Sequence, residues 1–406
     1  MKKRVIYLDN AATTPVRAEV LLAMKPYWNE SFGNPGSITK LGVAAKRAVE
    51  QARQTVADCL CGRPAEVIFT SGGTESNNLA IFGVVNYILN QPPTKLGAKR
   101  ITDLHFITTQ IEHSSITECF KALERRGAQV DYLAVDSNGL IDLADLRKCL
   151  KANTVLVSIG YANNEIGVIQ PLKEIAKEVR HARNFRHSES SNYPYLHTDA
   201  SQAGLYCNLA LNELGVDLLT LDAQKINGPK GVGVLFVRAG TSLDPLIYGG
   251  GQERGLRAGT ENVPLIVGLA KALELCQGSA FGMSKSLALT SLRDYFWQKI
   301  KKEIPTAVLN GDPVRRLPNN LNISLPGLDS EFTVLCLDEA GIISSTRSAC
   351  SHDEDGSAVV RALGQGQSLS RSTLRFSLGE DITKKDIDFV VKKLTEIVKR
   401  QKLASL

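Results

Sequence analysis

The chain has 406 residues, of which 43% are hydrophobic and 22% charged, and its formal net charge is +6. This composition is typical of a globular protein with two or three domains and a sizeable core, and no basic run interleaved with aromatics indicates nucleic-acid binding. No apolar run is as long as a membrane span, so we expect no membrane contact. The eight cysteines lack zinc-ligand spacing, so we expect no metal site and a cytoplasmic protein with reduced thiols.

Strands and helices alternate along the first two thirds of the chain. We expect strands at residues 5–8, 66–70, 105–109, 130–135, 154–161, 195–198, from 219 and at 234–237, and helices at 17–28, 42–60, 75–89, 114–126, 143–150 and 172–183. Residues 184–193 are polar and indicate an exposed insertion. Apolar strands separated by helices predict a mixed, mostly parallel sheet with helices on both faces, which is an α/β fold.

The pattern changes after residue 262. We expect helices at 264–276, 287–302 and 384–402, and strands at 320–324, 341–344 and 373–377. This order predicts a smaller α+β domain that also recruits the N-terminal strand. The sequence therefore divides into a large domain at residues 14–262 and a small domain formed by residues 1–13 and 263–406.

Lys225 lies between an apolar strand and a turn rich in glycine and proline, in the stretch LTLDAQKINGPKGVG. A lysine placed this way is partly desolvated and firmly held, and its neutral amine is able to attack a carbonyl and form a Schiff base. Taken alone, the stretch fits an ordinary hairpin lysine better. Other motifs in the sequence favour the Schiff-base interpretation.

Polar residues follow several of the expected strands. His113, Asn164, Asp199 and Lys225 each come after a strand end, as does the glycine-rich turn in TSGGTESNN at residues 70–78. Ligands of such sheets bind at the carboxyl ends of the strands, so a single site is expected there. The glycine-rich turn resembles an anion cradle at a helix start, although a plain capped turn explains it equally well.

Three further residues have both a chemical and a structural interpretation. Asp199 fits as the partner of a protonated pyridine nitrogen, or as the cap of a turn. Cys350 lies in the small polar run TRSACSHDEDGSA, which describes a loop that brings a thiol to a substrate, or an incidental cysteine. Arg375 is flanked by apolar strand residues and fits a substrate carboxylate, or a structural salt bridge.

Together these motifs resemble the cysteine desulfurases, which are pyridoxal 5'-phosphate (PLP) enzymes of fold type I in the class-V aminotransferase group. The segments that carry the resemblance run in order along nearly the whole chain: LDNAATTP, GNPGS, FTSGGTESNN, EHSSI, ANNEIG, HTDASQ, QKINGPKGVG, GGGQERGLRAGTEN, SAC and LRFSLG. The SAC form is similar to the branch that serves iron–sulfur cluster assembly.

The resemblance implies a role for each matching residue. Lys225 would bind PLP covalently and shuttle protons, Asp199 would pair with the ring nitrogen, and His113 would stack on the ring. Cys350 would attack the sulfur of L-cysteine, which leaves L-alanine and an enzyme persulfide. The remaining implied contacts are Gln202 and Asn164 at the ring oxygen, Gly73 and Thr74 at the phosphate, Thr260 of a second subunit at the same phosphate, and Arg375 at the substrate carboxylate. A homodimer and a sulfur-acceptor protein that docks near the Cys350 loop are also implied.

The chain departs from the resemblance next to the lysine. Similar enzymes usually have Ser and His where this chain has Asp222 and Gln224, and both positions normally contact the phosphate. A carboxylate there repels a phosphate dianion unless it is protonated, turned away or paired with a cation. Thr39 also replaces a usual His. Two alternatives therefore stay open beside the desulfurase: a selenocysteine lyase, and a non-catalytic dimeric scaffold of the same fold.

Overall fold

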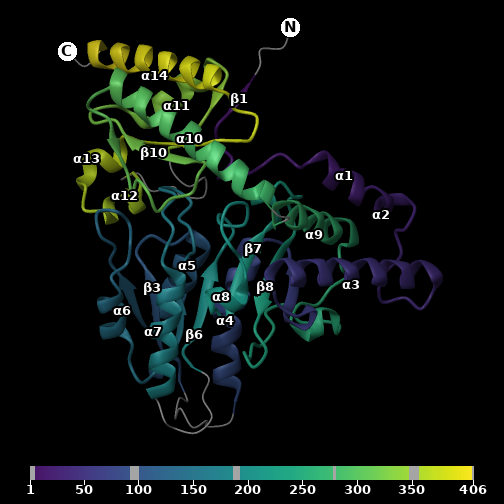
Figure 1. Cartoon of the computed structure of the whole chain (residues 1–406). Coiled ribbons are helices and arrows are strands. Elements are labelled where there is room, and N and C mark those ends of the chain that lie inside the picture. The colour runs from purple at the N-terminus through teal and green to yellow at the C-terminus, as the bar shows by residue number, and fades with distance from the viewer. Residues whose placement is uncertain (1–4, 92–99, 186–192, 278–279, 347–355, 405–406) are drawn as a thin grey trace.

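The computed structural model describes residues 5–91, 100–185, 193–277, 280–346 and 356–404. Figure 1 shows a central sheet flanked by helices, with a smaller group of helices and strands above it. Within the described residues the main sheet has seven strands in the order β2-β8-β7-β6-β5-β3-β4. Only β8 runs antiparallel to its neighbours, so the sheet is mixed and mostly parallel, as predicted.

The seven strands are short and almost wholly buried. They are β2 (Val67–Thr70), β3 (His105–Thr109), β4 (Gln129–Leu133), β5 (Thr154–Ser158), β6 (Tyr195–Asp199), β7 (Leu218–Asp222) and β8 (Gly233–Val237). Every residue of β2, β3, β5, β7 and β8 is buried, which explains their continuous apolar character in the sequence. The edge strand β4 is more exposed.

Helices cover both faces of this sheet and complete two hydrophobic cores. On one face α3 (Lys40–Leu60) packs against α9 (Val263–Gln277), together with α7 (Leu172–Phe185). The other face is covered by α4 (Gly73–Asn90) and α5 (Ser114–Arg125). The smaller helices α6 (Leu143–Cys149) and α8 (Leu211–Leu214) complete the periphery.

A third core lies in the upper part of Figure 1. There α10 (Ala280–Glu303) and α14 (Lys384–Ala404) pack on a three-stranded antiparallel sheet of β9 (Val308–Leu309), β10 (Asn320–Ser324) and β12 (Thr373–Ser377). The N-terminal strand β1 (Ile6–Tyr7) pairs in parallel with β11 (Ile342–Ile343), so the N-terminal segment lies beside a strand of the C-terminal part of the chain. The division after residue 262 stays a prediction, and α9, which follows it, packs in the core of the large sheet.

Several expected bounds were wrong in instructive ways. The helix expected at 17–28 is two helices, α1 (Ala18–Met24) and α2 (Pro26–Asn29), because Pro26 has no N–H to continue the hydrogen-bond ladder. The strand expected at 154–161 ends at Ser158, and the chain then turns into the site. Sequence periodicity also missed α11 (Ser330–Glu339), α12 (Ala358–Ala362) and α13 (Gly366–Arg371). The insertion expected at 184–193 lies largely outside the described residues.

The topology brings five strand ends to one edge. Because β2 and β7 both run antiparallel to β8, they run parallel to each other, and β3, β5 and β6 share their direction. The last residues of these five strands therefore open on the same side of the sheet. The small sheet approaches this edge through β12, where Ser377 contacts residues 8–11 of the N-terminal segment.

Candidate active site

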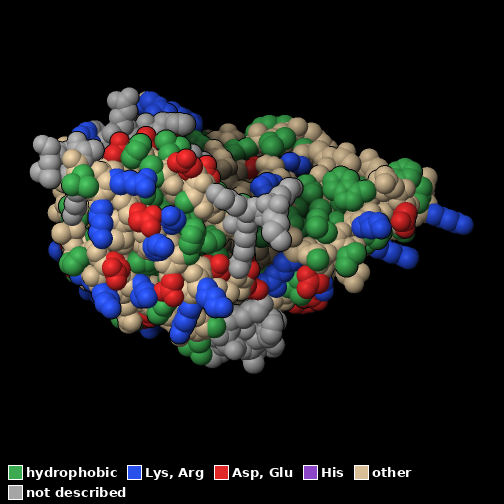
Figure 2. Space-filling model, turned by 90° about the horizontal axis from the view of Figure 1, so that it is seen from above, with side chains coloured by type: hydrophobic (Ala, Val, Ile, Leu, Met, Phe, Trp, Pro, Cys, Tyr) green, Lys and Arg blue, Asp and Glu red, His purple; other side chains and the backbone are tan. Residues whose placement is uncertain are grey.

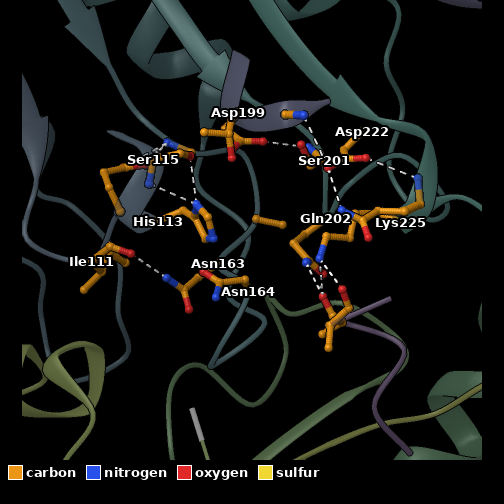
Figure 3. Close-up of a pocket in the computed structure, with 18 of the residues that line it drawn as sticks. Ile111, His113, Ser115, Asn163, Asn164, Asp199, Ser201, Gln202, Asp222 and Lys225 are labelled. Atoms are coloured by element: carbon orange, nitrogen blue, oxygen red, sulfur yellow. Dashed lines mark hydrogen bonds between the residues drawn. The ribbon is translucent and has the colours of Figure 1, made fainter. Parts of the chain in front are cut away.

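A cavity of about 290 Å³ lies at this edge, and most of the predicted site residues line it (Figure 3). Those residues are Gly73, Thr74, His113, Asn164, Asp199, Gln202, Asp222, Gln224, Lys225 and Arg375. They come from the ends of β2, β3, β5, β6 and β7 and from β12. The structure therefore brings these separate motifs to one cavity, while their roles stay predictions.

Lys225 ends a short 3-10 turn, η3 (Ala223–Lys225), directly after β7. Its half-buried side chain donates hydrogen bonds from Nζ to the carbonyl oxygens of Ala11, at 2.9 Å, and Ala12, at 2.6 Å. Thr14 donates from its backbone N–H and its hydroxyl to the carbonyl of Gln224. The N-terminal segment thus crosses the lysine turn and holds the amine inside the cavity.

Asp199 is fixed at the end of β6 by two donors. Its carboxylate accepts from the side-chain amide of Asn77 at 2.8 Å and from the backbone N–H of Ser201 at 2.9 Å. Asn77 also donates to the hydroxyl of Ser115 at 2.8 Å, and that hydroxyl lies 2.8 Å from Nδ1 of His113. A continuous hydrogen-bonded chain therefore joins the carboxylate to the imidazole.

The imidazole of His113 is held in one orientation. His113 precedes α5, and its Nδ1 accepts from the backbone N–H of Ser115 at 3.2 Å. Burial is the main cause that lowers the pKa of His113. A neutral imidazole that accepts at Nδ1 carries its hydrogen on Nε2, so this network assigns the Nε2–H tautomer.

Arg375 reaches the cavity from β12 of the small sheet. Its side chain is 1% exposed and forms an ion pair with Asp9 at 2.7 Å, and it also donates to the carbonyl of Asn164 at 2.9 Å. Its Nε is buried without a hydrogen-bond partner. The structural salt bridge considered from the sequence is therefore present, and the guanidinium keeps a donor for a further acceptor.

Among the residues that sequence reasoning missed, Glu112, Ser115 and Ser201 line this cavity, and Asn77 holds the carboxylate of Asp199 from α4. The carboxylate of Glu112 accepts from the backbone N–H of Gly160 and from the hydroxyl of Thr109. Burial raises the pKa of Glu112 to about 7. Asn77 faces the site only because of its place on α4. Glu112, Ser115 and Ser201 follow the ends of β3 and β6 within a few residues, and that position is the signal that could have found them.

The donor set fits PLP unequally along the cavity. An amine, a firmly held carboxylate and an imidazole suit an aldehyde on a pyridinium ring. At the other end the start of α4 and the buried hydroxyl of Ser201 suit an anion. However, Asp222 already lies there, because its carboxylate accepts from the N–H of Gly73 at 3.3 Å and from the side chain of Gln224 at 3.1 Å.

One predicted residue lies elsewhere, and another falls outside the described residues. Thr260 is exposed and lines a separate pocket of about 190 Å³ with Ser71 and Arg257. Cys350 lies outside the described residues.

Among the residues that the structure describes there is no cluster of three or more potential metal ligands. None of the described helices is both long and apolar enough to cross a membrane.

The fold and this lysine-centred cavity define a class, the PLP-dependent enzymes of fold type I. Within that class, the chain belongs to the class-V aminotransferase family, whose model (Aminotransferase class-V) matches residues 6–390. The predicted fold class and resemblance are thereby confirmed.

Relatives match over nearly the whole length. Cysteine desulfurase IscS of Dictyoglomus turgidum is 42% identical, over 99% of this chain and 97% of that protein. A mitosomal cysteine desulfurase of Trachipleistophora hominis is also 42% identical, over 97% of this chain and 86% of its own length. Among solved structures, a NifS-like protein has a TM-score of 0.86 at 34% identity, covering 98% of this chain and 100% of that one.

Proposed function

We propose that this chain is a PLP-dependent cysteine desulfurase. The observation that carries the proposal is the convergence of Lys225, Asp199, His113 and Arg375 on one cavity. The names of the relatives, cysteine desulfurases at about 40% identity over the full length, support it. In this reaction L-cysteine and the thiol of Cys350 give L-alanine and a persulfide on Cys350, so the sulfur atom moves between two thiols and no external oxidant is needed.

Bound PLP supplies an electron sink for carbanion chemistry. Lys225 would hold its aldehyde, since the amine is fixed beside residues 11 and 12. Asp199 would pair with the ring nitrogen, because Asn77 and Ser201 hold its carboxylate in place. His113 presents Nε2–H and is suited to hold or pass a proton at that atom.

The substrate carboxylate would bind at Arg375. The ion pair with Asp9 and the bond to the Asn164 carbonyl occupy part of the guanidinium and orient it. Since Arg375 lines the cavity, its guanidinium would donate to a carboxylate oxygen there. Gln202 donates to the carbonyl of Ala11, which also accepts from Lys225, so its amide positions the N-terminal segment around the cofactor.

We further propose a homodimer and a sulfur-acceptor protein as partners, and a cytoplasmic location. Large apolar side chains are exposed along the arm formed by α1, α2 and the start of α3, among them Leu22 (68%), Trp28 (54%), Phe32 (64%) and Ile38 (97%). Such a surface suits burial against a second copy. Elsewhere, on the face drawn in Figure 2, Lys and Arg side chains are interspersed with Asp and Glu. In a dimer, Thr260 would belong to the phosphate end of the partner's cavity.

The proposal is tested by incubating the purified protein with PLP and L-cysteine. We expect equimolar alanine and acid-labile sulfide in the presence of a reducing thiol. Cys350→Ala should abolish persulfide formation, whereas Cys61→Ala, which removes an exposed cysteine at the C-terminal end of α3, should leave it unchanged. Undiminished turnover in Cys350→Ala would refute the role of that thiol.

The same assay separates the two alternatives. A strong preference for L-selenocysteine over L-cysteine would indicate a selenocysteine lyase. A protein that gains no visible chromophore with PLP, and no alanine production, would indicate a scaffold. Under the desulfurase proposal, L-cysteine turns over and the chromophore forms.

A further inference from the structure

The N-terminus of α4 is a built anion site that already contains a carboxylate. This 18-residue helix begins at Gly73, and its free N–H groups and dipole favour a negative charge. Gly72, at φ 149°, lets the chain turn into it. The carboxylate of Asp222 takes that place, because Oδ2 accepts from the N–H of Gly73 at 3.3 Å.

A second observation is a buried polar group without a hydrogen-bond partner beside the same helix start. Ser201 is 8% exposed, lines the cavity, and has a buried hydroxyl with no hydrogen-bond partner. That hydroxyl would lie 3.3 Å from a Cβ placed on Gly73, so it points at the same helix start. A buried, unpaired hydroxyl costs stability unless a ligand satisfies it.

Asp222 itself is buried and firmly placed. It ends β7, and its Oδ1 accepts from the backbone N–H of Gln224, which caps the turn that carries Lys225. Its Oδ2 also accepts from the Gln224 side chain. The three hydrogen bonds that reach this carboxylate come from neutral N–H groups. A phosphate bound at the same helix start would therefore lie next to a carboxylate that these donors hold in place (Figure 3).

Two anions this close cannot both keep their full charge. A dianion beside a carboxylate disfavours ionisation of one of them, and the pair then shares a proton. The second ionisation of a phosphate ester has a pKa of about 6, so above pH 7 the free ligand is a dianion and the missing proton has to come from solvent.

We propose that this end of the cavity binds the phosphate of PLP with uptake of one proton, which Asp222 and a phosphate oxygen share. The proposal rests on the proposed function and extends it, because Asp222 then sets how the cofactor affinity depends on pH. Free enzyme, the PLP dianion and one proton give a complex in which the carboxyl O–H donates to a phosphate oxygen. No other bond is made or broken at this end.

Other ionisable groups face the same cavity. They are Glu112 and His113 from the start of α5, Asp199 from β6, Lys225 from η3 and Arg375 from β12. Glu75, in the first turn of α4, turns away to the N–H of Ser71 and to Arg257. Pyridoxal lacks the phosphate but has the same ring and aldehyde as PLP, so the groups around the ring and the aldehyde contribute equally to the binding of both. The ratio of the two affinities therefore isolates the phosphate end.

The test measures dissociation constants of PLP and of pyridoxal, from absorbance titrations, between pH 7.0 and 8.5. For the wild type we expect the preference for PLP over pyridoxal to fall by up to tenfold per pH unit as pH rises. Asp222→Asn and Asp222→Ser both remove the charge and retain a capping side chain. In these variants the preference for PLP over pyridoxal should be larger than in the wild type at pH 8.5 and nearly independent of pH. The exposed control Asp58→Asn should behave as the wild type.

Calorimetric titration in buffers of different ionisation enthalpy gives a second readout, the number of protons taken up on binding. We expect an uptake of about one proton when PLP binds. When pyridoxal binds, we expect no proton uptake that depends on Asp222. A wild-type preference that does not change with pH, or an unchanged slope in both Asp222 variants, would overturn the inference. Neither result would touch the proposed function. Failure of both aldehydes to form a borohydride-reducible adduct would instead contradict the proposed function.

Discussion

The two ends of the cavity differ in how their charges are balanced. At the Asp199 end, the carboxylate has two fixed donors and the imidazole of His113 is neutral and oriented. At the α4 end, a carboxylate lies where a second anion is expected, and a buried hydroxyl lacks a partner. Under the proposed function, the Asp199 end would hold a cationic ring, and the α4 end would bind an anion together with a proton.

This difference originates in one short segment. Asp222 and Lys225 are separated by two residues on the β7–η3 turn, so the strand that delivers the amine also delivers the carboxylate. The turn needs a capping side chain at residue 222, and Asp, Asn and Ser all meet that need. The local fold is therefore compatible with several side chains at residue 222, while the proposed covalent chemistry needs an amine at residue 225.

The largest effect is expected where the small sheet meets the cavity. Replacing Arg375 with Leu leaves the carboxylate of Asp9 without its partner, and breaking such a buried pair costs about 3–5 kcal/mol of unfolding free energy. Urea denaturation of the apo-protein measures this loss. The double variant Arg375→Leu/Asp9→Asn should recover part of it, and a single variant as stable as the wild type would show that the pair does not hold the two regions together.

The Asp199 end is tested by Asp199→Asn. Loss of a charge-assisted hydrogen bond to the ring nitrogen should cost about 3 kcal/mol, a decrease of about a hundredfold in kcat on L-cysteine. Asn77→Ala removes one of the two donors to this carboxylate and should cost less, about tenfold. A kcat within threefold of the wild type in Asp199→Asn would contradict the role of this carboxylate.

The strand that ends at Asp199 contains a buried histidine, His197, which makes the stability of the fold depend on pH. His197 is fully buried between Ser158 and Thr220, and burial lowers its pKa to about 4. Below pH 6.5 the unfolded chain binds a proton that the folded chain does not, so stability should fall by about 2 kcal/mol between pH 6.5 and pH 5. Denaturation at several pH values measures the slope, and His197→Gln should remove this contribution. An identical slope in that variant would exclude His197 as its source.

The smallest effect is expected at Gln202. Its amide donates to the carbonyl of Ala11 at 2.9 Å and helps hold the N-terminal segment over the lysine. Gln202→Ala should cost about 1 kcal/mol, a few-fold weaker affinity for PLP and for pyridoxal alike. Because both aldehydes contact the same region, a loss confined to PLP would place Gln202 at the phosphate end instead.

Much of this site could be predicted because strand ends are visible in a sequence. Buried strands such as β5 and β7 appear as apolar runs, and the polar residue after each run marks the shared edge. Asn77 could not be predicted, because it lies inside a helix whose facing partner is known only once β6 is placed beside it. The strand order and the antiparallel β8 depend on pairing between distant segments, which local patterns do not contain.

The resemblance located Asp222 and Gln224 but not their geometry. Three outcomes were open for the carboxylate: protonated, turned away or paired with a cation. The structure shows that it is not turned away, since it accepts from Gly73 at the helix start. Side-chain direction at the end of a strand depends on the neighbouring helix, so this result required the tertiary structure.

The central claim is that the amine of Lys225 holds the aldehyde of PLP. The direct measurement is borohydride reduction of the protein with PLP, followed by proteolysis and mass spectrometry. We expect one pyridoxyl modification per chain at Lys225, absent in Lys225→Ala. A modification at the neighbouring Lys230, or none on any peptide, would contradict it.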